Sequence, residues 1–163
     1  QVGVAHILLN AGADANSINA RTGNSALINA SRLGFDQVVA LLLQQGANVH
    51  HANLKGETAL YHATTYGRIN AVRQLLAAGA SPHQLANNRC SALTAAQYYC
   101  LHPTEKMTAT DVENIKKSVA EIEAHEHRKK SNASALATHG TFPPPGHTQS
   151  KPHKVHSKKC TIM

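Results

Sequence analysis

The sequence predicts an all-α fold, a solenoid of stacked pairs of short helices. The first observation is a period of 33 residues, at which Gly23, Gly34 and Gly46 recur as Gly56, Gly67 and Gly79. A second is that each period holds two aliphatic patches at helical spacing, which is typical of solenoid repeats. A third is composition: the 163 residues include no Trp and only two Phe, so the core must rest on Leu, Ile, Val and Ala.

Within one period the pattern predicts a first helix over residues 25–33 and a second over residues 36–45. Gly34 provides the turn between them, and Gly46 ends the second helix where a left-handed backbone is wanted. The aliphatic side chains of residues 38–43 fall on one helix face, so we expect neighbouring units to cover it. The polar stretch over residues 47–55 leads to the next unit.

The segments GNSALINASRLGFDQVVALLLQQGANVH (residues 23–50) and GETALYHATTYGRINAVRQLLAAGASPH (residues 56–83) resemble ankyrin repeats. The resemblance covers about residues 2–100 and implies helix-turn-helix pairs joined by short hairpin loops. The chain opens in the second helix of a preceding repeat, so we expect further sequence upstream of Gln1. The domain of repeats is assigned to residues 1–102, with its first repeat partial.

The segments also depart from the family's pattern. The family's Pro is replaced by Ala26, Ala59 and Ala92, and its His by Ile28, Tyr61 and Thr94. The resemblance therefore implies that the hydrogen bond which this His makes to the neighbouring loop is absent. The third repeat is degenerate because Arg89 takes the place of its turn glycine, as terminal repeats often are.

A longer helix is expected over residues 104–130. Thr110 and Glu113 have the spacing of a capping box, and Val112, Ile115, Val119 and Ile122 form one apolar stripe. We interpret this segment as a closing helix that covers the last repeat. The alternative is a detached helix that binds a partner.

Residues 131–159 are rich in Pro, His and Lys with few large apolar side chains, so we expect a disordered tether. Residues 160–163, Cys-Thr-Ile-Met, resemble a CaaX prenylation box and imply farnesyltransferase as a partner and Cys160 as the lipid attachment site. One lipid chain binds a membrane weakly. Lysines upstream would add electrostatic attraction to an anionic membrane: Lys151, Lys154, Lys158 and Lys159.

The net charge of +7 is carried by Arg128 and the six lysines after it, because all nine acids lie at or before Glu126 and are matched there by basic residues. The predicted folded part is therefore neutral, and no nucleic acid is expected as a partner. No catalytic motif, metal site or cofactor is predicted. Cys90 and Cys100 are expected to pack as small apolar residues rather than to bind zinc.

What remains is protein binding through the hairpin tips and the concave face of the first helices, which the family uses. The resemblance implies the following binding residues: Arg21, Asn29, Arg32, Leu33, His51, Asn53, Lys55, His62, Thr65, Tyr66, Tyr98 and Tyr99. We expect a non-enzymatic interaction module on the cytosolic face of a membrane, and on a host membrane if the chain is a bacterial effector. The alternatives are a soluble cytoplasmic adaptor with an unmodified tail, or the targeting region of an enzyme whose catalytic part lies upstream.

Overall fold

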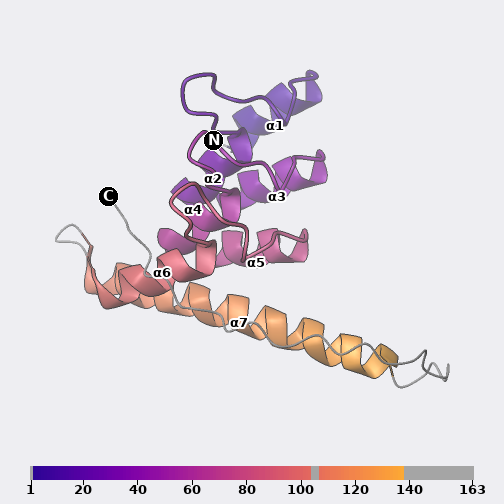
Figure 1. Ribbon diagram of the computed structural model, residues 1–163. Helices are drawn as coiled ribbons and strands as arrows, with labels where there is room; N and C mark the ends of the chain where they lie inside the picture. The colour runs from indigo at the N-terminus through magenta and orange to yellow at the C-terminus, as the bar shows by residue number, and fades with distance from the viewer. Residues whose placement is uncertain (1, 104–106, 138–163) are drawn as a thin grey trace.

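The structure, a computed structural model, describes residues 2–103 and 107–137, with side chains described up to Asn132. Figure 1 shows stacked helices lying on a long final helix. Over the described residues the fold is helical, with two isolated β-bridges and no strand, so the all-α prediction is confirmed. The helices are α1 Val2–Asn10, α2 Ala26–Leu33, α3 Asp36–Gln44, α4 Ala59–Thr65, α5 Ile69–Ala77, α6 Ala92–Leu101 and α7 Ala109–Ala137.

Hydroxyl side chains define where the first helix of each repeat begins. The hydroxyl of Ser25 accepts a hydrogen bond from the backbone of Ile28 at 3.3 Å, and Thr58 and Ser91 do the same one and two repeats later at 3.2 Å each. Such caps satisfy amide groups that a helix start leaves without partners. These residues are therefore the starting points of α2, α4 and α6.

The core lies between successive helix pairs. Helix α4 packs between α2 and α6, while α5 packs against α3 on one side and α7 on the other. Leu27, Leu60 and Leu75 are fully buried or nearly so, and alanines such as Ala63 and Ala95 let the helices approach closely. The predicted burial of the aliphatic seams between units is confirmed.

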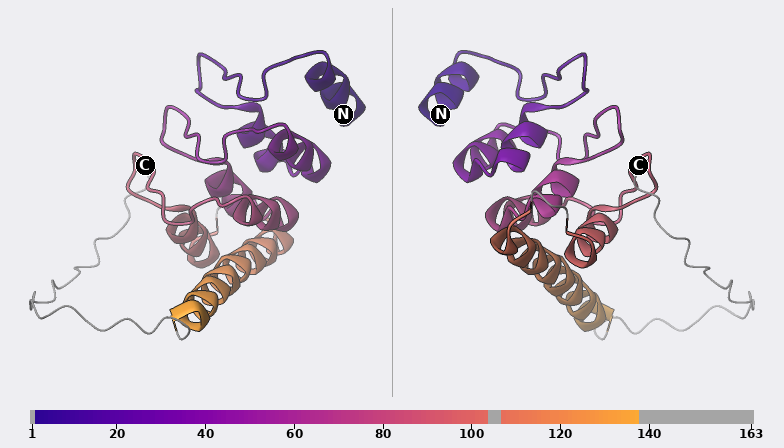
Figure 2. Two further views of the ribbon diagram at one scale, coloured as in Figure 1. Left: turned by 90° about the vertical axis from the view of Figure 1, so that its right-hand side faces the viewer. Right: turned by 90° about the vertical axis from the view of Figure 1, so that its left-hand side faces the viewer.

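The hairpin loops stack on each other on one side of the helices (Figure 2). The amide of Leu54 donates to the carbonyl of Thr22 at 3.2 Å, and the amide of Asn87 donates to the carbonyl of Lys55 at 2.9 Å. Gly56 has a φ of +75°, and a Cβ added there would lie 2.8 Å from the amide nitrogen of Asn87. Glycine is needed at such a turn both for its backbone angle and for the close approach of the next loop.

A histidine also links neighbouring loops, although the family's own histidine is missing. The ring of His51 is half buried, and its Nε2 lies 2.8 Å from the carbonyl oxygen of Gly23. The sequence predicted only that the bond of the family's own histidine is absent, because Ile28, Tyr61 and Thr94 stand at its positions. The bond of His51 is a different one, made by a loop residue, and the repeat pattern did not predict it.

Helix α7 covers the end of the solenoid, as the sequence predicted. It packs on α6, α5 and α4, and Ile115, Ser118 and Ile122 on its inner face are fully buried. The buried hydroxyl of Ser118 donates to the carbonyl of Asn114 at 3.0 Å, which satisfies it inside the helix. Figure 1 shows the C-terminal part of α7 extending past the stacked helices.

The ends of α7 differ from the prediction. The capping box involves Thr108 and Asp111, not Thr110 and Glu113: the Thr108 amide donates to the Asp111 carboxylate at 2.9 Å, and the Asp111 amide donates to the Thr108 hydroxyl at 3.2 Å. The helix also continues to Ala137, beyond the predicted end at Lys130. The predicted tether from residue 138 on, with Cys160 and the four lysines, lies outside the described residues.

Candidate functional site: a cleft between the helix stack and the closing helix

A cleft of about 530 Å³ opens where the hairpin loop before α4, helix α4 itself, α6 and the start of α7 meet. Helix α4 contributes side chains one turn apart, which places them on one face of the helix. The residues that line the cleft are Lys55, Glu57, Tyr61, His62, Thr65, Tyr66, Arg68, Tyr99, Met107, Asp111 and Ile115. Several residues that the sequence predicted to bind a partner therefore lie together: Lys55, His62, Thr65, Tyr66 and Tyr99.

The polar centre of the cleft is formed by Glu57 and His62. The Nε2 atom of His62 lies 3.2 Å from Oε2 of Glu57, and both side chains are more than four-fifths buried. The close contact with the His62 ring, followed by the hydrogen bond from Asn53 and the positive charge of Lys55, lowers the pKa of the Glu57 carboxyl despite its burial. A carboxylate held in this way is already supplied with hydrogen-bond donors, so it is a poor acceptor for a ligand.

Tyrosines form much of the remaining surface. The ring of Tyr66 stacks on His62 with centroids 6.3 Å apart, yet 48% of Tyr66 is exposed. Tyr61 is buried, and burial raises the pKa of its hydroxyl. Tyr99 is half buried, and burial likewise raises its pKa. An exposed aromatic side chain next to buried ones is an arrangement that often anchors a protein interface.

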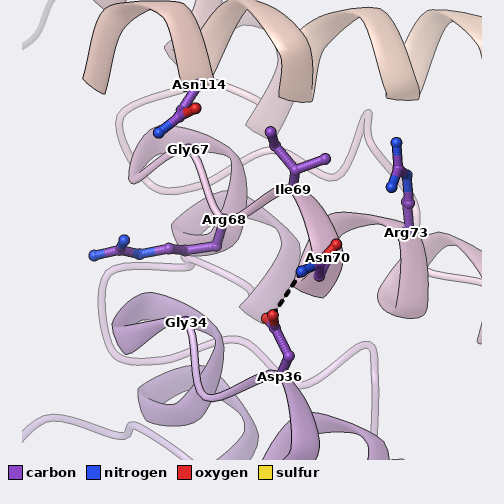
Figure 3. A pocket seen from close by; sticks show the side chains of 8 residues that line it. All are labelled: Gly34, Asp36, Gly67, Arg68, Ile69, Asn70, Arg73 and Asn114. Carbon is purple, nitrogen blue, oxygen red and sulfur yellow. Dashed lines mark hydrogen bonds between the residues drawn. The ribbon is translucent and has the colours of Figure 1, made fainter. Parts of the chain in front are cut away.

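A second hollow, of about 360 Å³, lies on the other side of Arg68 (Figure 3). It is bounded by the two inter-helix turns at Gly34 and Gly67 and by Asn114 of α7. Its polar groups are already used within the chain: the Asn70 amide donates to the Asp36 carboxylate at 2.8 Å, and Arg73 is paired with Glu121. This hollow offers few unpaired groups to a ligand.

The other predicted binding residues lie elsewhere. Arg21 and Leu33 are exposed, whereas Asn29 is half buried and accepts a hydrogen bond from Asn24. His51 and Asn53 are held in contacts between loops, and the carbonyl of Arg32 accepts a hydrogen bond from Arg68. Tyr98 makes edge contact with Tyr99 at 6.0 Å and does not line the cleft.

Several lining residues were not predicted. Met107, Asp111 and Ile115 come from the segment that opens α7, and no repeat spacing relates them to α4. Glu57 and Arg68 could have been found from the sequence. Glu57 lies just before α4 and Arg68 just after it, so both border the helix face that the predicted binding residues share. Sequence reasoning missed them because it transferred only the positions that the family's repeats use.

The described residues lack two features that would indicate other functions. Within residues 2–103 and 107–137, no group of three or more His, Cys, Asp or Glu side chains is arranged to hold a metal ion. No helix in the described part of the chain combines the length and apolar character that crossing a bilayer needs.

Comparison with known proteins agrees with the repeat architecture. Residues 1–86 match a family model described as ankyrin repeats in three copies. An ankyrin repeat and KH domain-containing protein, mask-1 from Caenorhabditis elegans, is 35% identical over 96 residues, which is 58% of this chain and 4% of that protein. The mouse B-cell lymphoma 3 protein homolog is 38% identical over 74 residues, which is 45% of this chain and 16% of that protein.

A solved structure shows the same fold. The crystal structure of the ankyrin repeat domain of Bcl-3 superposes with a TM-score of 0.53 and 28% identity, covering 69% of this chain and 44% of that one. The chain therefore spans less than half the length of these relatives. With the family model matching more than half of its residues, the chain belongs to the ankyrin-repeat family, whose repeats serve as protein–protein interaction modules.

Proposed function

We propose that the chain is a non-enzymatic module that binds a protein partner through its hairpin tips and the face formed by its first helices. The observation that carries this proposal is the cleft beside α4, where Tyr66 is 48% exposed above a floor of buried side chains. A large exposed tyrosine on a rigid helix can bury much apolar area in an interface with little loss of conformational freedom.

Site-specific photocrosslinking in cells tests this proposal. A photoreactive amino acid at position 66 should crosslink to a distinct protein, because Tyr66 borders the cleft. The same amino acid at position 37 is the control, since Gln37 is exposed on α3, a second helix of its repeat. Equal crosslinking at both positions, or none at either, would contradict a binding face at the cleft.

We further propose that the module is held on the cytosolic face of a membrane through a prenylated Cys160 and the lysines before it. Sequence alone supports this half: a CaaX-like end follows a polar segment with Lys151, Lys154, Lys158 and Lys159. One prenyl chain gives reversible binding, and each lysine near an anionic leaflet adds about 1 kcal/mol. The setting is a eukaryotic cytosol, in which the chain is either a resident protein or a bacterial effector modified by host enzymes.

Intact mass after expression in a prenylating cell tests the anchor. The expected result is an added farnesyl group that disappears in Cys160→Ser, together with release of the protein from the membrane fraction. A matched variant, Cys100→Ser, should keep both the added mass and the membrane fraction, because Cys100 lies in α6. An unmodified Cys160 would rule out the proposed membrane anchor. The chain would then be a soluble interaction module whose tail serves only as a linker.

A further inference from the structure

We propose that the cleft beside α4 binds a linear segment of its protein partner in which acidic residues flank an aromatic or aliphatic side chain. The inference rests on the proposed function, since it presupposes a protein partner, and it adds the chemistry of the bound segment. Three features of the cleft support it: an apolar floor, two exposed cations that form no ion pair among the described residues, and the separation of those cations.

The floor of the cleft suits an apolar side chain. Ile115 is fully buried and Tyr61 is 7% exposed, so both lie beneath the cleft and form the apolar support of its floor. Tyr99 and Met107 are half buried beside them, and Tyr66 stands exposed at the edge. An aromatic side chain entering between them would meet tyrosine rings and a thioether, both of which favour aromatic partners.

The acidic and basic side chains of the cleft differ in whether they are free to bind a ligand. Both carboxylates already have partners: Glu57 accepts a hydrogen bond from Asn53 and lies 3.2 Å from the His62 ring, and Asp111 accepts from the amide and hydroxyl of Thr108. By contrast, Lys55 and Arg68 are exposed and form no ion pair with a carboxylate among the described residues. The groups left to bind a ligand are therefore cationic, and they complement carboxylates.

The structure leaves the end of the Arg68 side chain available. Its Nε donates to the carbonyl of Arg32 at 3.2 Å, which fixes the stem of the side chain. Figure 3 shows its guanidinium group pointing away from Asp36, Asn70 and Arg73. The terminal nitrogens of a guanidinium held in this way are well placed for a bidentate contact with a carboxylate.

The two cations stand at opposite ends of α4. Lys55 precedes the helix in the hairpin loop, and Arg68 follows it in the turn to α5. The seven residues of α4 extend for about 10 Å at the usual helical rise, and an extended peptide covers about 3.3 Å per residue. A bound segment that reaches both cations would thus place its acidic residues at least about three positions apart, with the apolar residue between them.

Selection of peptides on the folded protein tests this inference without knowledge of the partner. A phage-displayed library of random peptides is panned on the immobilised chain, and enriched sequences are synthesised with a fluorescent label for anisotropy titrations. The expected consensus has two acidic residues flanking an aromatic or aliphatic residue at the stated spacing. Replacing the acidic residues with their amides should weaken binding about tenfold or more, and added NaCl should weaken it as well.

Variants of the protein locate the bound peptide. Lys55→Glu and Tyr66→Ala should each weaken binding about tenfold or more, and Arg68→Gln should weaken it severalfold while keeping most of the stem. The matched control is Lys130→Glu, the same change of charge at an exposed site of α7 that does not line the cleft. Far-ultraviolet circular dichroism checks that every variant keeps its helices.

Three outcomes would overturn the inference. They are enrichment of peptides without acidic residues, binding that ignores both Lys55→Glu and Tyr66→Ala, and a library that yields no peptide at all. A different result would separate this inference from the proposed function. If a protein crosslinks at position 66 but Lys55→Glu does not change its binding, the acidic segment is ruled out and the proposed function is kept. Tighter binding of a labelled single-stranded oligonucleotide than of any selected peptide would replace the acidic segment with a nucleic acid.

Discussion

Gly67 and Asn114 are in such close contact that the turn between α4 and α5 rests directly on helix α7. A Cβ atom added at Gly67 would lie 2.7 Å from the Cβ atom of Asn114 and 3.1 Å from the backbone nitrogen of Ile115. No side chain fits in that space. The position of α7 against the last repeats therefore depends on a glycine that the repeat pattern requires for a different reason, its φ of +64°.

Gly67→Ala should destabilise the chain more than Gly46→Ala does. Both glycines have a positive φ, where alanine is strained by about 1–2 kcal/mol. A Cβ at Gly46 would have no neighbour within 4 Å, so that variant carries the backbone strain alone. Urea denaturation should show the larger loss for Gly67→Ala, because α7 must also shift. Equal losses for the two variants would mean that α7 does not rest on this turn.

The buried stripe of α7 should be essential for the stability of the repeats. Ile115 and Ile122 are both fully buried against the last helices. Replacing either with Ala should lower the free energy of unfolding by about 2–5 kcal/mol, the usual range for a buried aliphatic side chain. Leu101→Ala is the control, because Leu101 is 76% exposed. Unchanged unfolding midpoints for Ile115→Ala and Ile122→Ala would support a detached helix instead of a closing one.

The contact between His51 and Gly23 should stabilise the stack of loops. His51→Ala removes the ring whose Nε2 lies 2.8 Å from the Gly23 carbonyl, and a half-buried hydrogen bond of this kind contributes about 0.5–1.5 kcal/mol. His50→Ala, at an exposed neighbouring position, provides the comparison. Amide hydrogen exchange should show faster opening of the loop around Gly23 in His51→Ala only. Identical exchange in both variants would argue that the ring adds nothing to the junction.

The sequence predicted the repeats well and the cleft only in part, and both outcomes have physical reasons. Glycine turns, hydroxyl caps and aliphatic patches act within one repeat, so their spacing alone was enough to place α2 and α3 within a residue of their observed bounds. The cap of α7 was placed at Thr110 when Thr108 and Asp111 form it, because both pairs satisfy the same local pattern. Met107 and Ile115 reach the cleft only through packing between distant segments, which no local spacing encodes.

Low pH should destabilise the chain in part through Glu57. Its pKa is lowered in the folded state, first by the close contact with His62, so the unfolded state binds protons more readily at acidic pH. The stabilisation is therefore complete above the ordinary pKa of 4.5 and is lost as the pH falls through the lower folded value. Glu121 and Asp111 also have lowered pKa values, owing to Arg73 and Thr108 respectively, and they act in the same direction.

Glu57→Gln isolates this contribution. The variant should be less stable than the parent at neutral pH, and its stability should fall less steeply between about pH 5 and about pH 3. Urea denaturation across that interval measures both quantities. The comparison variant Glu123→Gln changes an exposed carboxylate on α7 and should keep the parent's steepness. If the stability of Glu57→Gln falls with pH as steeply as that of the parent, the acid sensitivity comes from other carboxylates.

Arg89 should be replaceable by glycine with a gain in stability. It adopts a φ of +62° at the position where Gly23 and Gly56 stand in the earlier loops. The following loop packs closely against both glycines. A Cβ added at Gly23 would lie 2.7 Å from the backbone nitrogen of Leu54, and one added at Gly56 would lie 2.8 Å from that of Asn87. Because no fourth loop stacks on the third within the described residues, a side chain at position 89 meets no such obstacle and has only backbone strain to overcome.

Relief of that strain, about 1–2 kcal/mol, exceeds the added flexibility of glycine in the unfolded chain, about 0.4–1 kcal/mol. Arg89→Gly should therefore raise the unfolding midpoint slightly, whereas Gly56→Ala should lower it clearly because it combines strain with a clash. Thermal denaturation of the two variants beside the parent measures both signs. A lower midpoint for Arg89→Gly would mean that the arginine side chain itself stabilises the last loop.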